Sequence, residues 1–157
     1  MGVAIIEGLH MLFATFWFGG TLFVNFVLGP ATARTSPAAA GEMGIQIGIQ
    51  ANRVIPPVAG LAILLGFLRG TVWGPIDSLS TVFNTGFGRW WFIALVLAII
   101  TFLWGQRLTG PAAASIGAAT TAEERAARVQ TTLRLASLEL VGFLGIFSMM
   151  ILMRFYP

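Results

Sequence analysis

The stretch VAIIEGLHMLFATFWFGGTLFVNFVLG, residues 3–29, decides the fold class. A helix needs about 20 apolar residues to cross the hydrocarbon core of a membrane, and this stretch exceeds that length. It lacks the polar–apolar alternation of a transmembrane β-strand, so a helix is the structure that satisfies its backbone in lipid. It also lacks the basic start of a cleaved signal peptide and carries Glu7 and His10. The stretch therefore predicts a transmembrane helix.

Three further apolar runs follow the first. Together they predict membrane spans at about residues 3–29, 53–73, 89–108 and 134–154. Hydrophobic residues make up 57% of the 157 positions and charged residues only 10%, whereas soluble domains carry about 25% charged residues. We expect residues 1–157 to form one all-α domain, an integral membrane four-helix bundle.

The segments between these spans carry signals of helix starts. Pro56 and Pro57 fit the first turn of the second span, where a missing N–H group costs little. Residues 38–50 are predicted to form a short interfacial helix. Thr121, which precedes two glutamates, is typical of a helix N-terminus and predicts a helix that continues into the fourth span.

The charged residues predict membrane orientation rather than nucleic-acid binding. The chain has no lysine or cysteine, a net charge of +3, and arginines scattered at the ends of the apolar runs, which is not a basic stripe for phosphates. Six arginines flank the first and third connections and three lie on the other side. The larger group is Arg34, Arg53, Arg107, Arg125, Arg128 and Arg134, and the smaller group is Arg69, Arg89 and Arg154. Because cytoplasmic segments are enriched in basic residues, we expect both termini outside, in an inner (plasma) membrane, with lipids as partners and no nucleic acid.

The single histidine is the first candidate for a binding site. At 100° per residue, His10 shares a helix face with Glu7, Ala14 and Trp17. Imidazole is a good ligand for heme iron or copper, and polar groups inside a membrane are functional candidates because they are costly there. The alternative is that His10 simply forms a hydrogen bond across a helix pair.

Methionines of the fourth span could complete such a site. By the helix rise, Met149 and Met153 lie at the same depth as His10, near the outer boundary. Thioethers with one imidazole suit Cu(I), and His/Met is also an axial pair for heme. The alternative is that these methionines only fill gaps in an apolar helix end.

Glu139 is the other charge inside a span. It lies close to the inner boundary, near the levels of Arg53 and Arg134, so a structural ion pair with one of them is the favoured interpretation. A proton relay is the functional alternative.

Several short motifs resemble the copper-resistance CopD-like membrane proteins, a broad group with HemJ-type oxidases as distant relatives. The best of them is His10 followed seven residues later by Trp17 and then by Gly19-Gly20, within a run that also contains Leu9, Phe23 and Gly29-Pro30-Ala31. The likeness continues with Arg53, Phe87-Gly88-Arg89, Leu133-Arg134 and Leu138-Glu139-Leu140. Family members often carry a lysine in the third helix, and this chain has Trp90-Trp91-Phe92 there instead.

The resemblance implies a membrane protein that binds copper or heme b, in copper homeostasis or membrane electron transfer. On this interpretation His10, Met149 and Met153 would hold the metal, and Trp17 would lie against the cofactor. The missing lysine argues against protoporphyrinogen oxidation, and no nucleophile–base pair indicates an enzyme. The alternative function is an accessory subunit that binds lipid and partner helices. Both interpretations predict a homo-oligomer or a larger membrane complex.

Overall fold

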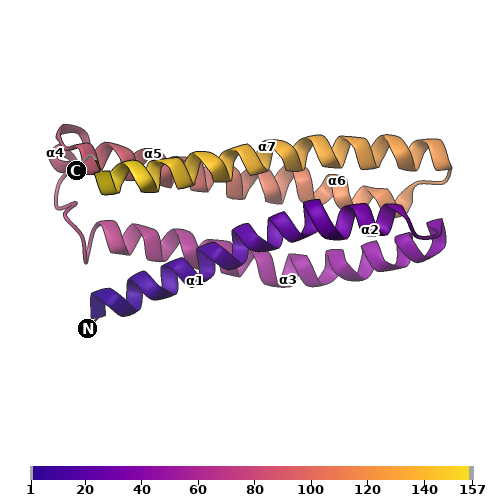
Figure 1. The fold of residues 1–157 in the computed structure, drawn as a ribbon, viewed down its shortest axis with the longest axis horizontal. Helices are drawn as coiled ribbons and strands as arrows, with labels where there is room; N and C mark the ends of the chain where they lie inside the picture. The colour runs from indigo at the N-terminus through magenta and orange to yellow at the C-terminus, as the bar shows by residue number, and fades with distance from the viewer. Residues whose placement is uncertain (1, 156–157) are drawn as a thin grey trace.

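The computed structural model describes residues 2–155, and within them it contains helices and no strands. Four long helical segments lie side by side (Figure 1). The first consists of α1 (Gly2–Phe23), a π-helical turn η1 (Val24–Leu28) and α2 (Gly29–Ala33), and the second is α3 (Pro37–Gly70). The short α4 (Leu79–Asn84) comes next. The third segment consists of α5 (Gly86–Trp104), a second π-helical turn η2 (Gly105–Thr109), α6 (Gly110–Ser115) and η3 (Ile116–Ala118). The fourth segment is α7 (Ala122–Phe155). All four are long and apolar enough to cross a membrane, so the chain is a multi-pass membrane protein with the predicted four-helix architecture.

The bundle consists of two helical hairpins that share one pattern. α1 packs against α3, and α5 packs against α7. In each hairpin the first helix contains a five-residue π-helical turn directly before a Gly-Pro pair, at Gly29-Pro30 and Gly110-Pro111. From 29 to 110 is 81 positions, and the same interval separates Arg53 from Arg134. The two halves therefore share one pattern in the same orientation, at an interval of 81 positions.

The second span begins earlier than its apolar run predicts. α3 begins at Pro37, where the Ser36 hydroxyl accepts a hydrogen bond from Ala39 N–H at 3.4 Å, and it continues without a break to Gly70. Residues 38–50 are helical, as expected, but belong to this helix. Pro56 and Pro57 consequently lie inside a helix rather than in its first turn, so that prediction was wrong. Each proline removes one i→i−4 hydrogen bond, which makes this level the expected bend of α3.

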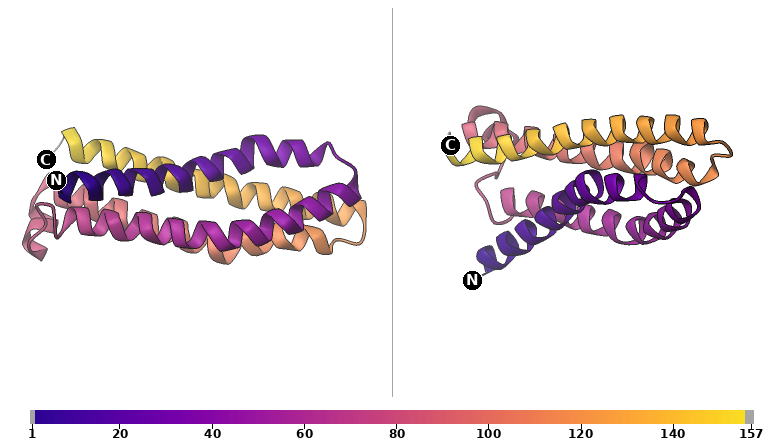
Figure 2. Two further views of the ribbon diagram at one scale, coloured as in Figure 1. Left: turned by 90° about the horizontal axis from the view of Figure 1, so that it is seen from below. Right: turned by 45° about the vertical axis from the view of Figure 1, so that its right-hand side comes forward.

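The helix starts after the second and third connections follow ordinary capping chemistry. The Thr121 hydroxyl accepts Glu124 N–H at 3.1 Å directly before α7, which confirms the predicted helix start. The Ser78 hydroxyl accepts Thr81 N–H at 3.2 Å and begins α4. The connection that contains α4 and both described chain ends lie at one end of the bundle (Figure 2).

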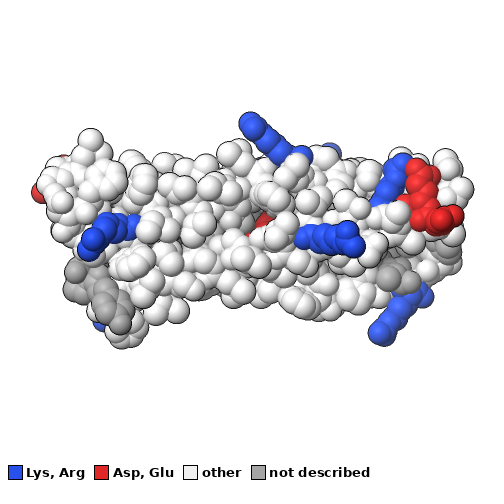
Figure 3. Space-filling model, turned by 90° about the horizontal axis from the view of Figure 1, so that it is seen from above, with Lys and Arg blue, Asp and Glu red and all other residues white. Residues whose placement is uncertain are grey.

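The helices are longer than the membrane is thick. α3 and α7 have 34 residues each, which is about 51 Å against about 30 Å of hydrocarbon. Three pairs of arginines bracket the apolar part: Arg53 and Arg69, Arg89 and Arg107, and Arg134 and Arg154. Their separations of 16, 18 and 20 positions correspond to about 24, 27 and 30 Å. One end of the bundle, made of residues 31–52 and 108–133, therefore projects beyond the bilayer, and basic side chains stand out on that half of the molecule (Figure 3).

Trp17 lies at the centre of the small core. Its side chain is 4% exposed, and its ring meets Phe143 edge-on at a centroid distance of 4.8 Å. Ala59 and Ala62 of α3 are buried beside it. Small residues let helices approach closely, which matters in lipid because packing rather than water exclusion holds helices together there.

Candidate functional site

His10 is fixed against α3 by one hydrogen bond across the first hairpin. Its Nδ1 lies 2.8 Å from the carbonyl oxygen of Ala62. A carbonyl oxygen only accepts, so Nδ1 carries the proton in this contact, and in the neutral ring Nε2 keeps its lone pair. Metal-bound histidines usually hold their second nitrogen in this way, because the hydrogen bond sets both tautomer and orientation.

Gly66 gives the imidazole its space on α3. A Cβ at this position would lie 2.8 Å from His10 Cε1, closer than real Cβ contacts come. The carbonyl oxygen of Gly66 in turn accepts a hydrogen bond from Trp91 Nε1 of α5 at 3.3 Å. The indole of Trp91 also packs directly against Gly70, because a Cβ on Gly70 would lie 2.0 Å from Trp91 Nε1. One stretch of α3 thus receives a ring N–H from each neighbouring helix.

His10 and Trp91 occupy equivalent positions in the two repeats. They are 81 positions apart, the same interval that relates the two Gly-Pro pairs. Both donate a ring N–H to a carbonyl of α3, at Ala62 and Gly66. The difference is that indole has no second nitrogen, whereas imidazole keeps Nε2 for a ligand.

An ion pair lies beside His10. Arg69 Nε of α3 is 3.6 Å from Glu7 Oε2 of α1, and Glu7 precedes His10 by three residues on the same helix. Both side chains are partly exposed, so the pair adds little to stability. The effect of the ion pair is local: Arg69 balances the negative charge of Glu7 next to His10.

The other predicted site residues lie on α1 and α7. Met153 packs against a cluster formed by Ile76, Val82 and Trp91, and Met149 is half-buried on α7. Trp17 lies in the core between the hairpins. The observed hydrogen bond and the close approach of His10 both involve α3, at Ala62 and Gly66. The structure therefore brings His10 to Ala62 and Gly66, and through Gly66 to Trp91, against which Met153 packs.

His10 offers one oriented imidazole to a metal or cofactor. Within residues 2–155 no three His, Asp or Glu side chains gather where they could hold a metal ion. Cu(I) would need soft partners assembled around the imidazole, and Met153 is engaged in the Trp91 cluster instead. Heme iron needs one or two protein ligands, so a single oriented imidazole is a sufficient start.

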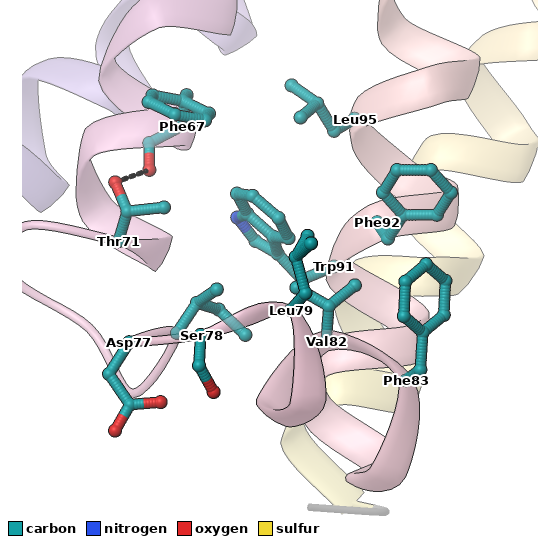
Figure 4. A pocket seen from close by; sticks show the side chains of 11 residues that line it. Phe67, Thr71, Asp77, Ser78, Leu79, Val82, Phe83, Trp91, Phe92 and Leu95 are labelled. Carbon is teal, nitrogen blue, oxygen red and sulfur yellow. Dashed lines mark hydrogen bonds between the residues drawn. The ribbon is translucent and has the colours of Figure 1, made fainter.

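An apolar groove opens on the other side of Trp91. Its volume is about 460 Å³, and it lies between the end of α3, the following connection, α4 and α5. Figure 4 shows the aromatic rings that line it. The lining residues are Phe67, Thr71, Ile76, Asp77, Ser78, Leu79, Val82, Phe83, Trp91, Phe92 and Leu95. At its polar edge, hydrogen bonds from Thr81 and Ser78 hold the pKa of Asp77 below its usual range.

Glu139 is buried but does not form the favoured ion pair. Its side chain is 8% exposed, and it makes no ion pair with Arg53 or Arg134, whose side chains are exposed. The carboxyl packs instead against η2, where a Cβ on Gly105 would lie 2.9 Å from Glu139 Oε1. The predicted cluster of Glu139, Arg53 and Arg134 is therefore not assembled in the described chain.

Sequence reasoning missed the partners of both polar residues. Trp91, which was not among the predicted site residues, is 9% exposed and donates a hydrogen bond to the Gly66 carbonyl. The repeated Gly-Pro pairs could have identified it, because the interval of 81 residues places it opposite His10. No sequence signal marks the proximity of Thr109 to Glu139, since it arises from the turn η2.

Comparison with known proteins gave no relative. No family model, curated protein or solved structure matches the chain.

Proposed function

We propose that this membrane protein binds heme b through His10 Nε2 and serves membrane electron transfer or copper homeostasis, as the resemblance to CopD-like proteins implies. The observation that carries the proposal is the 2.8 Å contact from His10 Nδ1 to the Ala62 carbonyl, which leaves Nε2 free. A bound heme would supply the redox chemistry. The chain's own part is to orient the imidazole through Ala62 and Gly66.

One imidazole supplies one axial ligand. The second ligand of a six-coordinate heme would be His10 of another copy of the chain, which makes a symmetric dimer the expected assembly. Copper bound at His10 and the two methionines remains the alternative, and an accessory subunit without a cofactor is the third possibility.

His10→Ala is expected to abolish bound heme while the bundle stays folded. The measurement is the absorption spectrum and the metal content of protein purified from heme-supplemented cells. His10→Gln is the matched control, because its amide can still donate to Ala62 while it offers no imidazole. Wild-type heme content in either variant would contradict the proposal. If the wild-type protein contains copper and His10→Ala does not, the copper site is favoured. If the wild-type protein contains no metal, the accessory subunit is favoured.

The orientation is a second part of the proposal. The basic end of the bundle, with six of the nine arginines, is assigned to the cytoplasmic side of the inner (plasma) membrane, and both termini to the outside.

A reporter inserted between η3 and α7, next to Thr120, is expected to show a cytoplasmic location. The segment is an exposed turn, so an insertion there should not disturb helix packing. The same reporter next to Asp77, in the opposite connection, should show the outside. An exchanged pair of results would invert the orientation.

A further inference from the structure

Glu139 is a buried carboxyl that the heme proposal does not use. It is 8% exposed, and it lies five positions inside the level of Arg134, which is about 7–8 Å along α7. The helix on which it stands crosses the membrane, so the surroundings at this depth are lipid and packed protein. An ionised carboxylate without a partner is strongly disfavoured in such a place.

The basic groups near this depth do not neutralise it. Arg134 on its own helix, Arg53 on α3 and Arg107 on η2 lie close to its level along the bundle, but all three side chains are exposed and none forms an ion pair with Glu139. On the first hairpin, the side-chain amide of Asn25 donates a hydrogen bond from Nδ2 to the Thr21 carbonyl oxygen at 2.8 Å. No charged group of the described chain therefore balances a negative charge at Glu139.

Polar contacts to the carboxyl come from the third helical segment. Gly105 opens the π-helical turn η2, and the absence of its Cβ makes room for Glu139 Oε1. Thr109, at the end of the same turn, places its hydroxyl beside the carboxyl. That Oγ1 is buried and lies outside hydrogen-bonding geometry with every described group. A buried hydroxyl without a partner is rare and calls for an explanation.

A π-helical turn is an uncommon feature that often accompanies a functional site. Here it aligns the small Gly105 and the hydroxyl of Thr109 with one carboxyl. The equivalent turn η1 of the first repeat faces no acid, because position 58, which corresponds to Glu139, is a valine. The carboxyl is thus a feature of the second hairpin alone.

We propose that Glu139 and Thr109 form a proton-binding site inside the bundle. The proton gives the carboxyl a neutral form that the buried position tolerates. The Thr109 hydroxyl is a hydrogen-bonding group beside the carboxyl that can serve either form of the acid. The proposal is independent of heme binding.

Infrared spectroscopy of the wild-type protein in lipid tests the site. The expected result is a carbonyl band of a protonated carboxylic acid, sensitive to exchange into D2O, which persists at neutral pH and loses intensity as the pH is raised. Glu139→Gln should remove this band. Glu42→Gln, a substitution of an exposed acid on α3, should leave it unchanged.

Thr109→Val tests the composition of the site, because it keeps the shape of the side chain and removes the hydroxyl. The band should remain but shift, since the carbonyl loses a hydrogen-bonding neighbour. An unchanged band would exclude Thr109 from the site. If the spectra recorded between about pH 5 and about pH 8 show that Glu139→Gln removes only a carboxylate band, Glu139 is ionised in that range and the proposal is overturned. A well-folded Glu139→Gln protein that keeps the acid band would overturn it as well.

Discussion

Trp17→Ala is expected to lower the free energy of unfolding by about 3–5 kcal/mol. The indole is 4% exposed and stands between the hairpins, in contact with Phe143 and Phe102 at centroid distances of 4.8 and 6.3 Å. Its removal leaves a cavity beside Ala59 and Ala62, which are too small to fill it. Helix association in lipid depends on packing contacts, so the substitution removes contacts of the kind that hold the bundle together. Equilibrium unfolding in mixed detergent micelles would measure it.

Phe16→Ala is the matched control for Trp17. Phe16 is the neighbouring aromatic residue on α1, but it is 53% exposed and faces the lipid side. Its removal should change the free energy of unfolding by only about 0.5 kcal/mol. Equal losses in the two variants would show that Trp17 contributes no more than general hydrophobic surface.

The fold was largely predictable because its signal is compositional. Four long apolar runs require four helices, and lipid allows few other structures. The helix ends were less predictable, because the residues that project beyond the membrane carry weaker patterns. Residues 38–50 belong to α3 rather than to a separate helix. Pro56 and Pro57 predict a helix start, because prolines are common in the first turn of a helix, but they lie inside α3.

The candidate site was predictable in its residues and not in its partners. His10 and Glu139 were identified because polar groups in a membrane are rare. The π-helical turn η2 moves the residues beside Glu139 away from the faces that 100° per residue assigns. At His10, which precedes η1, the partners depend on how α1 is rotated against its neighbours. A site inferred from depth alone, such as His10 with Met149, lacks this information.

The contact between the second pair of helices depends on a glycine. Gly142 of α7 lies against Thr101 of α5, and a Cβ at position 142 would lie 2.3 Å from Thr101 Oγ1 and 3.3 Å from its Cβ. Thr101 is 3% exposed and β-branched, so it has little freedom to move aside. Closer approach of helices at small residues is the general mode of packing in lipid.

Gly142→Ala is therefore expected to destabilise the bundle by about 1–3 kcal/mol through overpacking, although alanine is the better helix former by about 1 kcal/mol. Gly60→Ala is the control, since a Cβ at position 60 meets no atom within 4 Å, and it should leave stability unchanged or raise it. The decisive measurement is a double-mutant cycle with Thr101→Ala, which removes the hydroxyl that the new methyl group meets. The double variant should recover most of the loss, with a coupling energy of about 0.5–3 kcal/mol. Strict additivity of the two substitutions would mean that α5 and α7 do not pack at Gly142 as the structure has them.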